Sequence, residues 1–451
     1  MSEAQRLPYD PTSVESIVAY AQKLVDSTLR SHIQPKSIAD PKRRKGSFGN
    51  AVEEHYFLYD INSDAAPDFA QAGLELKTTP LKKNRNGSVV SKERLVITMI
   101  NYLEVVKETF ETSHFLAKAS DILLILYLYE KDKDPLDYLI KFAELWNLPA
   151  EDIPIFKNDW ETVVNKIRAG RAHEISGRDT LYLEACTKAS NSTVTRSQPF
   201  SDIPAKPRAW ALKASYMTSV VNNFFEMSAI KRAESEEDLG LFDLVHRRFQ
   251  PYFGKTEDEL AAEFGYLKKN GRKPKNLCAL ITKRILGVDE KLKIAEFEKA
   301  GIKPKTLRIK RSGMPKEAVS FPAFDYCELA ETKFSDSAFC SYLESKYLFV
   351  IFREDETDKG VYRLADIAFW QMDEADLEEA RRCYEEMQFR VIDGRADESV
   401  KSTENRCCHV RPHGRNAADT CMTPYGIPVT KKCFWLNTKY LAREIEKISN
   451  F

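Results

Sequence analysis

The sequence predicts a mixed α/β protein made of two tandem domains of similar size. A chain of 451 residues is longer than the roughly 250 to 300 residues at which single cores stop growing, so we expect two domains. Helical and strand-like patterns alternate through both halves. One segment, PDFAQAGLELKTTP at residues 67–80, is echoed by AEFEKAGIKPKT at residues 295–306. We predict domains over residues 1–225 and 240–451, joined by the charged linker 226–239.

Charge and composition exclude several functional classes. Basic and acidic residues each number 68, so no overall field draws the protein to nucleic acid or membrane, and any site for a polyanion is local. The nine cysteines form no CxxC pair and follow no targeting sequence, which predicts a reduced, cytoplasmic protein. The longest apolar run, residues 122–129, is far shorter than the about 20 residues of a membrane helix, so it predicts a buried strand and no membrane partner.

The first half begins with a predicted helix over residues 12–30, where apolar side chains recur at helical spacing behind a Thr/Ser cap. Three segments then carry strand-like patterns and predict a mixed sheet: residues 51–59, 67–80 and 94–106. A further amphipathic helix is predicted over residues 159–170, with Asp159 as its cap.

The second half repeats the first in order. Residues 241–265 predict a helix, a turn and a second helix that begins with a capping box from Thr256 to Glu259. Three pairs of segments then match: ETSHF (111–115) with ETKF (331–334), ILLILYL (122–128) with KYLFVIF (346–352), and WALKASYM (210–217) with FWLNTKYL (434–441). The offsets stay between about 220 and 230 residues, and a chance echo would not keep its register, so we infer an internal duplication.

The segment LELKT at residues 74–78 points to a chemistry. Alternation sends Glu75 and Lys77 to one face of a strand, and Gly73 allows a turn that brings Asp68 beside Glu75. Two carboxylates with room for water and a phosphate suit Mg²⁺, which polarises the phosphoryl group in phosphodiester hydrolysis while a nearby lysine holds the attacking water. The pattern is a nuclease signature, although the same spacing also occurs in surface strands with ordinary Glu/Lys alternation.

The surrounding segments resemble, in order, those of the MutH family of endonucleases: KGSFGNAVEE (45–54), DFAQAGLELKT (68–78), ETSHFLAK (111–118), DWETVVNKIRAG (159–170) and RAWALK (208–213). The resemblance covers most of residues 15–220, and a weaker second image covers residues 240–445. It implies a restriction-endonuclease-like (PD-ExK) fold in two tandem MutH-like domains, of which the second is catalytically degenerate. MutH and its relatives among type II restriction endonucleases cut at GATC. The resemblance therefore implies cleavage of both DNA strands at GATC with Mg²⁺, for which Mn²⁺ can substitute, and 5′-phosphate products.

The resemblance also implies the roles of individual residues in the first half. The catalytic set that it implies is Glu53, Asp68, Glu75, Lys77 and Lys118. Within this set Asp68 and Glu75, together with Leu76, match the metal-binding positions, and Lys77 matches the active-site lysine. Lys118 matches a lysine near the scissile phosphate. Glu53, on the helix before, lies one residue farther from Asp68 than in MutH, which leaves Glu54 open as the matching acid.

The second copy has lost this pattern. Its aligned pairs are Glu53 with Lys283, Asp68 with Glu296, Glu75 with Lys303, and Lys77 with Lys305. Two of three acids have become cations, which would repel Mg²⁺, and Pro304 replaces Leu76 and removes a strand donor. We expect Lys303 and Lys305 to contact DNA phosphates instead, together with the basic stretches 268–275 and 303–316.

Further DNA contacts are expected where the family approaches DNA. The residues concerned are Lys188, Asn191, Arg208 and Lys213 in the first half and Arg411, His413, Arg415 and Asn416 in the second. Ala211 aligns with a family tyrosine near the adenine, and the extra space predicts weaker blockage by adenine methylation than in MutH. A zinc site at CCHVRPHGRN (407–416) is the alternative for that segment. Adjacent cysteines are poor tetrahedral partners, whereas His409, Arg411, His413 and Arg415 alternate as a polar strand face would.

Three functions are compatible with these observations. The first is a type II restriction endonuclease that acts on double-stranded DNA, pairs as a homodimer on its site and needs no nucleotide cofactor. The second is a MutH-like repair nickase, which the fused second copy disfavours. The third is a DNA-binding regulator without cleavage, which the intact Asp68, Glu75 and Lys77 disfavour, because a pure binder has no reason to hold acids near phosphate.

Overall fold

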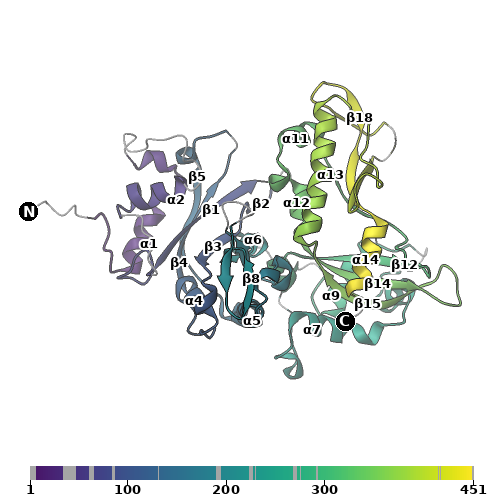
Figure 1. Cartoon of the computed structure of the whole chain (residues 1–451), viewed down its shortest axis with the longest axis horizontal. Helices are drawn as coiled ribbons and strands as arrows, with labels where there is room; N and C mark the ends of the chain where they lie inside the picture. The colour runs from purple at the N-terminus through teal and green to yellow at the C-terminus, as the bar shows by residue number, and fades with distance from the viewer. Residues whose placement is uncertain are drawn as a thin grey trace, which may run out of the picture. The chain divides into compact units, whose positions relative to one another are not determined.

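The computed structural model describes most of the chain. The described ranges are residues 7–33, 47–59, 66–83, 87–130, 132–188, 194–222, 227–228, 230–267, 272–274, 276–290, 293–414, 416 and 418–448. The chain separates into two compact units, Met1–Phe225 and Glu226–Phe451. Each unit combines helices with sheets, so the predicted mixed α/β class is confirmed (Figure 1). Within the described ranges no helix is long and apolar enough to cross a membrane.

The first unit is built on a four-stranded sheet in the order β2-β1-β4-β5. Its strands are β1 (Glu75–Lys83), β2 (Val89–Ser91), β4 (Asp121–Leu128) and β5 (Leu139–Asn147). β1 and β4 are parallel, with Glu75 opposite Ile122. β4 lies between β1 and β5 and buries Ile122 to Leu126 without interruption, which confirms the predicted buried strand.

A second sheet and a hairpin complete the strands of the first unit. The sheet has the order β3-β9-β6, and its strands are β3 (Leu95–Met99), β6 (Leu183–Thr187) and β9 (Arg208–Leu212). The hairpin pairs β7 (Arg196–Gln198) with β8 (Ser201–Ala205). The strand predicted over residues 94–106 therefore ends at Met99, and its second part is the short helix α3 (Tyr102–Val105), which Asn101 caps through the N–H of Leu103 at 3.1 Å.

The other α-helices of this unit, with one π-helical turn, are α1 (Val14–Gln22), α2 (Ser47–Ala51), the π-helical turn η4 (Val52–Tyr56), α4 (His114–Ala119), α5 (Ile153–Arg168) and α6 (Ala214–Val221). Ser13 caps α1 as predicted, but the helix ends at Gln22. The strand predicted over residues 51–59 is wrong, because Phe48, Val52 and Tyr56 recur at a spacing of four and bury one helical face. α1 lies along β5 and α2 along β1 (Figure 1).

Asp159 is not a helix cap. α5 begins at Ile153, so Asp159 lies inside the helix and is buried. Its carboxylate accepts hydrogen bonds from the N–H groups of Leu181, Tyr182 and Leu183 at 2.8, 2.7 and 2.9 Å. Asp159 thus accepts hydrogen bonds from the segment that leads into β6 instead of capping a helix. The spacing of residues in the sequence does not reveal this contact.

The second unit repeats this plan. Its first sheet has the order β12-β14-β15 and its second the order β13-β19-β16. The strands are β12 (Ile302–Ile309), β13 (Val319–Ala323), β14 (Lys346–Glu354), β15 (Tyr362–Trp370), β16 (Cys408–Pro412) and β19 (Lys432–Leu436), with a hairpin of β17 (Thr420–Met422) and β18 (Pro428–Thr430). β12 and β14 are parallel, as β1 and β4 are, with Lys303 opposite Tyr347. The matched strands show that the internal repeat is a structural duplication.

The helices of the second unit are α7 (Leu241–Phe249), α8 (Glu257–Glu263), α9 (Leu277–Ile285), α10 (Ala295–Ala300), α11 (Tyr326–Glu331), α12 (Ala338–Leu343), α13 (Glu374–Ile392) and α14 (Thr438–Ile448). The predicted capping box at α8 is confirmed, since Thr256 Oγ1 accepts the Glu259 N–H at 3.1 Å and Glu259 Oε2 accepts the Thr256 N–H at 2.7 Å. The long helix α13 lies beside α11 and α12 (Figure 1).

The segment expected to be a linker packs onto the second unit. β10 (Met227–Ser228) pairs with β11 (Lys293–Ile294), and Ile230 is buried. Glu236, also buried, forms an ion pair with Arg248 of α7 at 2.7 Å. Residues 230–239 therefore belong to the second unit rather than to a free connection.

Candidate active site

The site begins at a turn that places Asp68 beside β1. Gly73 has φ +70°, in the left-handed region that favours glycine, and a bridge between Phe69 and Leu74 closes the turn. One carboxylate oxygen of Asp68 accepts the N–H of Leu76 at 2.8 Å. Burial, and then the charge of Glu75, raise the pKa of Asp68. Asp68 and Glu75 are thus close enough to repel each other, as the sequence predicted.

Glu75 is the centre of the charged cluster. Its side chain is 3% exposed, and it forms ion pairs with the ammonium groups of Lys77 and of Lys118, the latter at 3.3 Å. Lys118 comes from α4, which leads directly into β4, so the parallel pairing of β1 with β4 brings the two residues together. Lys77 lies two residues after Glu75 on the same face of β1.

Glu53 is the fifth residue of this cluster, with Asp68, Glu75, Lys77 and Lys118. It lies in the π-helical turn η4, and burial followed by the charge of Asp68 raises the pKa of Glu53 to about 7. Glu54 is exposed and faces His55 at 3.9 Å. The choice that the sequence left open therefore falls on Glu53. A π-helical turn holds one residue more than an α-helical turn, which fits the one extra residue between Glu53 and Asp68.

The cluster has the donor set of a hard cation. Within the described part of the chain no three His, Cys, Asp or Glu side chains already converge as ligands. The pair of Asp68 and Glu75 is sufficient for Mg²⁺, which uses one or two carboxylates and takes its other ligands from water and phosphate. Leu76 buries its side chain and gives its N–H to Asp68, so only its carbonyl oxygen remains for a ligand role.

The corresponding place in the second unit is inverted in charge. Lys303, at the position of Glu75, donates to Ser345 Oγ at 2.9 Å and lies over the ring of Tyr342, 4.3 Å from its centroid. Tyr342 is the fifth residue of α12, as Lys118 is of α4, so a cation–π pair has replaced an ion pair. Burial, and then the charge of Lys305, lower the pKa of Lys303 to about 8.

Other differences complete the loss of the acidic site. Pro304 has no N–H to offer an acid in the way that Leu76 does, and the carboxylate of Glu296 instead accepts the N–H of Ile230 at 3.0 Å. Lys283 donates to the carbonyl of Glu290 at 2.8 Å, and Lys305 to that of Ser320 at 3.1 Å. The match of Tyr342 with Lys118 is not among the sequence predictions. It is visible in the sequence, because each residue lies the same distance after its cap, Ser337 or Ser113.

Two expected DNA contacts in the first unit are structural. Arg208 is buried and donates to the carbonyls of Ala185, at 2.6 Å, and of Ile175. Lys213 donates to the carbonyls of Gly177 and Thr180 at 2.8 and 2.6 Å, and burial lowers the pKa of Lys213. Both cations thus stabilise loops within the unit, and their contact with DNA stays a prediction.

The other predicted DNA-contact residues of the first unit are Lys188 and Asn191, with Ala211 near the adenine. Lys188 is exposed at the end of β6, and Asn191 lies outside the described residues. Ala211 is completely buried, in a small cluster with Ala209 and Cys186. The weaker blockage by adenine methylation stays a prediction.

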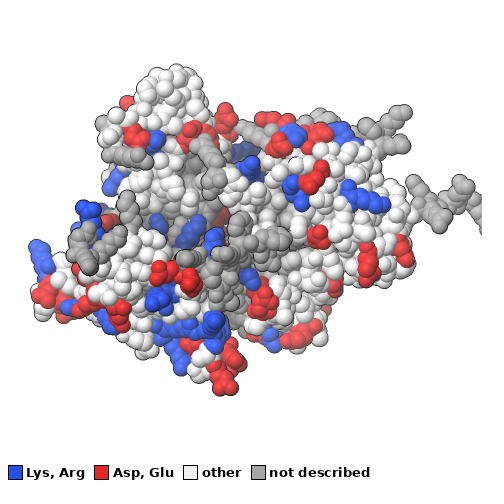
Figure 2. Space-filling view, turned by 180° about the vertical axis from the view of Figure 1, so that it is seen from behind, with Lys and Arg blue, Asp and Glu red and all other residues white. Residues whose placement is uncertain are grey.

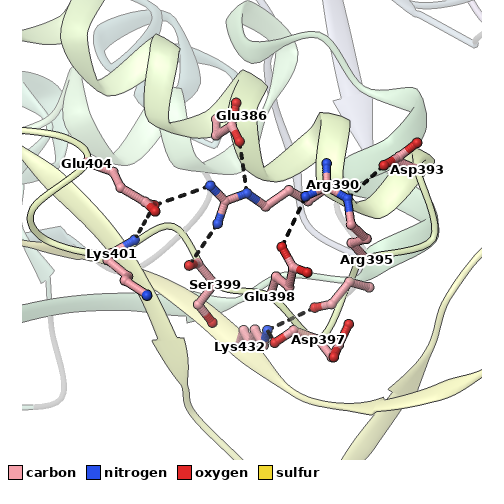
Figure 3. A network of polar contacts seen from close by, with 11 residues as sticks. Glu386, Arg390, Asp393, Arg395, Asp397, Glu398, Ser399, Lys401, Glu404 and Lys432 are labelled. Atoms are coloured by element: carbon pink, nitrogen blue, oxygen red, sulfur yellow. Dashed lines mark hydrogen bonds and ion pairs between the residues drawn. The ribbon is translucent and has the colours of Figure 1, made fainter.

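A buried cation at the start of the last strand recurs in the second unit. Lys432, at the start of β19 as Arg208 is of β9, donates to the carbonyls of Ala396 and Asp397 at 2.8 and 2.6 Å (Figure 3). Arg390 at the end of α13 holds the same turn through the Ser399 carbonyl at 2.9 Å (Figure 3). Both units thus keep a buried cation at the start of the last strand, although the charges at the position of the acidic cluster differ.

The expected DNA-contact segment of the second unit is exposed in part. Arg411, His413 and Asn416 are exposed, and His413 and Asn416 border a shallow cavity with Asp419 and Lys431. Arg415 lies outside the described residues. His409 lies on the same side of β16, since its ring, like Arg411 and His413, contacts Trp435. It is buried, however, and its Nδ1 meets the side-chain oxygen of Asn437.

The alternative zinc site is not supported. Cys407 and Cys408 are completely buried, and no three potential metal ligands come together among the described residues. All nine cysteines are free thiols. Burial also raises the pKa of Cys408 well above its ordinary value.

The expected basic stretches are largely compensated by acids. Arg308 forms a bidentate pair with Glu257 at 2.9 Å, and Lys273 pairs with Asp258 at 2.8 Å. Residues 268–271 and 275 lie outside the described residues. Figure 2 shows basic and acidic side chains interspersed over the face that it presents.

Comparison with known proteins agrees with this architecture. The family model "DNA mismatch repair enzyme MutH" matches twice, over residues 57–159 and 290–382. The type II restriction enzyme Sau3AI of Staphylococcus aureus is 34% identical over 466 aligned residues, which cover 90% of this chain and 94% of that enzyme. MutH proteins match one half only: that of Shewanella woodyi is 27% identical over 48% of this chain and 95% of its own length, and that of Vibrio vulnificus is 28% identical over 41% and 81%. The chain therefore belongs to the MutH-like type II restriction endonucleases and is a site-specific deoxyribonuclease built as a tandem of two MutH-like units.

Proposed function

We propose that this enzyme hydrolyses both strands of double-stranded DNA at GATC, in the cytoplasm, with Mg²⁺ and without a nucleotide cofactor, and leaves 5′-phosphate ends. The observation that supports the proposal most is the asymmetry between the units. Asp68, Glu75 and Lys77 form an acidic cluster with a lysine in the first unit, whereas Lys303 and Lys305 invert the charge in the second. The first unit is then the catalytic domain and the second a pseudo-nuclease.

The acidic cluster is assigned as the cation site. Asp68 and Glu75 would hold the ion together with the Leu76 carbonyl, and Glu53 lies close enough to share it. The bound ion polarises the phosphoryl group and stabilises the leaving oxygen. Mn²⁺ would substitute because oxygen ligands suit it equally.

The two lysines are assigned to the DNA and the attacking water. Without a cation, Lys77 and Lys118 both neutralise Glu75. When Glu75 becomes a ligand, these ammonium groups are free to turn toward the substrate. Lys77 then orients the water, and Lys118 contacts the scissile phosphate. The same pairs keep the empty cluster near neutrality and so limit the cost of burying acids there.

The second unit is assigned to DNA binding. Lys303 and Lys305 each use one donor within the protein and have others left for phosphate. Arg411, His413 and Asn416 offer exposed donors on β16 and the following loop. GATC is a palindrome with two scissile phosphates, while each chain has one competent centre. We therefore propose that a free monomer pairs with a second copy on DNA.

The two alternative functions are less well supported. The MutH protein of Shewanella woodyi aligns with 48% of this chain, whereas Sau3AI aligns with 90% of it, so a single-unit repair nickase accounts for less of the chain. A regulator that binds without cutting would not keep Asp68 and Glu75 at a phosphate site, where their charges oppose binding.

The proposal is tested by incubating the purified enzyme with a sequenced plasmid and Mg²⁺ and then sequencing the ends. We expect cleavage of both strands at GATC, 5′-phosphate ends and no activity in EDTA. Nicking of a single strand, or cleavage at other sequences, would contradict it. The fragment for testing the second unit begins at residue 226, because residues 230–239 pack onto that unit. It should bind GATC duplex without cutting it, with affinity that falls as salt rises.

A further inference from the structure

The hydroxyl of Tyr59 ends at the acidic cluster without a partner. Its oxygen is completely buried and makes no hydrogen bond. Burial, and then the charges of Asp68, Glu53 and Glu75 in that order, raise the pKa of Tyr59. The hydroxyl therefore keeps its proton and is a donor that faces carboxylates. Buried donors without an acceptor are uncommon in native folds and call for an explanation.

The backbone holds Tyr59 in this place at a conformational cost. The preceding residue, Leu58, has φ +59°, in the left-handed region that a bulky side chain rarely adopts. The Tyr59 N–H donates to the carbonyl of Glu53 at 3.2 Å. The ring packs edge-on against Phe69, the neighbour of Asp68, with centroids 5.4 Å apart. The chain thus reverses at a strained residue, ties the backbone of Tyr59 to Glu53 and packs its ring beside the residue that follows Asp68.

The second unit repeats this reversal without the hydroxyl. α9 is followed by Gly287, with φ +72°, and by Val288, whose N–H donates to the carbonyl of Lys283 at 2.9 Å. Val288 therefore takes the place of Tyr59, as Lys283 takes that of Glu53. The unit in which two of the three acids are replaced by lysine also lacks the hydroxyl, and it forms the left-handed turn with an unstrained glycine. The first unit, which keeps its acids, has both the hydroxyl of Tyr59 and the strained residue Leu58.

We propose that Tyr59 is a positioning residue for the divalent cation, and that its hydroxyl donates to the carboxylate of Asp68 when this carboxylate turns toward the ion. Asp68 is the acceptor that the packing favours, because the ring of Tyr59 lies against Phe69, its neighbour in the chain. Carboxylates that bind metals are commonly oriented by such a second hydrogen bond, and loss of that partner lowers metal affinity about 10- to 100-fold. The inference rests on the proposed cation site.

Tyr59→Phe tests it, because this change removes one oxygen and keeps the ring. Tyr9→Phe is the matched control: Tyr9 lies in the core against which Tyr59 packs, and its hydroxyl donates to the Phe57 carbonyl at 2.8 Å. Calorimetric titration of the full-length protein with Mn²⁺, without DNA, measures the Kd, and thermal unfolding in EDTA measures the stability without a cation. We expect Tyr59→Phe to raise the Kd about tenfold or more with an unchanged or higher Tm in EDTA. Tyr9→Phe should lower that Tm and leave the Kd unchanged.

Two results would overturn the role of Tyr59 alone. The first is an equal Mn²⁺ affinity of wild type and Tyr59→Phe. The second is a loss of Tm in EDTA for Tyr59→Phe as large as that for Tyr9→Phe, which would show that the hydroxyl has a structural partner. Absence of Mn²⁺ binding by the wild type would instead overturn the cation site itself, and with it this inference.

Discussion

The proton on Glu53 should make cation binding depend on pH in the neutral range. Burial and the charge of Asp68 raise the pKa of Glu53 to about 7. A cation that shares this carboxylate must displace the proton, since only the ionised form is a ligand. Because the pKa is raised, Glu53 is protonated below about pH 7, so the affinity for the cation falls as the pH falls.

The size of the effect follows from competition between one proton and one cation. The apparent Kd rises by about 11-fold at about pH 6, about twofold at about pH 7 and hardly at all at about pH 8. Glu53→Gln removes the titrating group. Its Kd for Mn²⁺ should be weaker at high pH than that of the wild type, but nearly level across this range.

Calorimetry measures both the affinity and the proton. Titration with Mn²⁺ without DNA, in two buffers of different ionisation enthalpy, should show release of about 0.9 proton per cation by the wild type at about pH 6. Glu53→Gln should release almost none. A wild-type Kd that is level with pH, or equal pH dependence of the two proteins, would refute a role for Glu53 at the cation.

Three further predictions concern the rest of the chain. Arg208→Met should lower the free energy of unfolding by about 2 to 4 kcal/mol, because it leaves buried carbonyls unpaired. Arg411→Ala should instead weaken DNA binding at an unchanged Tm. The reverse pattern would contradict these assignments. Lys303 has a pKa of about 8 and is charged below that pH. DNA binding by the fragment that begins at residue 226 should therefore weaken as the pH rises through about 8. An affinity that does not change with pH in filter binding would argue against the contact. Plasmids with two GATC sites should be cut faster than plasmids with one, and equal initial rates would exclude pairing on DNA.

The sequence predicted those parts of the site that local patterns determine. The alternation of Glu75 and Lys77 follows from strand geometry, and the turn before them follows from Gly73, the residue type that adopts positive φ without strain. The duplication was visible because matched segments keep their register over the chain. These are local or repeated signals, and tertiary contacts do not change them.

Other features depend on contacts between distant segments. Nothing adjacent in sequence to Arg208 or Lys213 shows that each donates to buried carbonyls more than twenty residues away, so a cation near a DNA-binding segment was assigned to DNA. The prediction that Asp159 is a cap fails for the same reason, because the N–H groups that donate to its carboxylate lie on another element. The helical form of residues 51–56 was missed because the apolar positions of a short segment fit either period.

The central claim is that one acidic centre, in the first unit, performs all cleavage, and paired amide substitutions test it most directly. Asp68→Asn and its counterpart in the second unit, Glu296→Gln, each remove one charge and keep the shape of the side chain. Initial rates of plasmid cleavage with Mg²⁺ should fall by at least about 100-fold in Asp68→Asn, since a ligand of the cation is lost, and remain near wild type in Glu296→Gln. Substantial cleavage by Asp68→Asn, or an equal loss in Glu296→Gln with intact folding, would contradict the account.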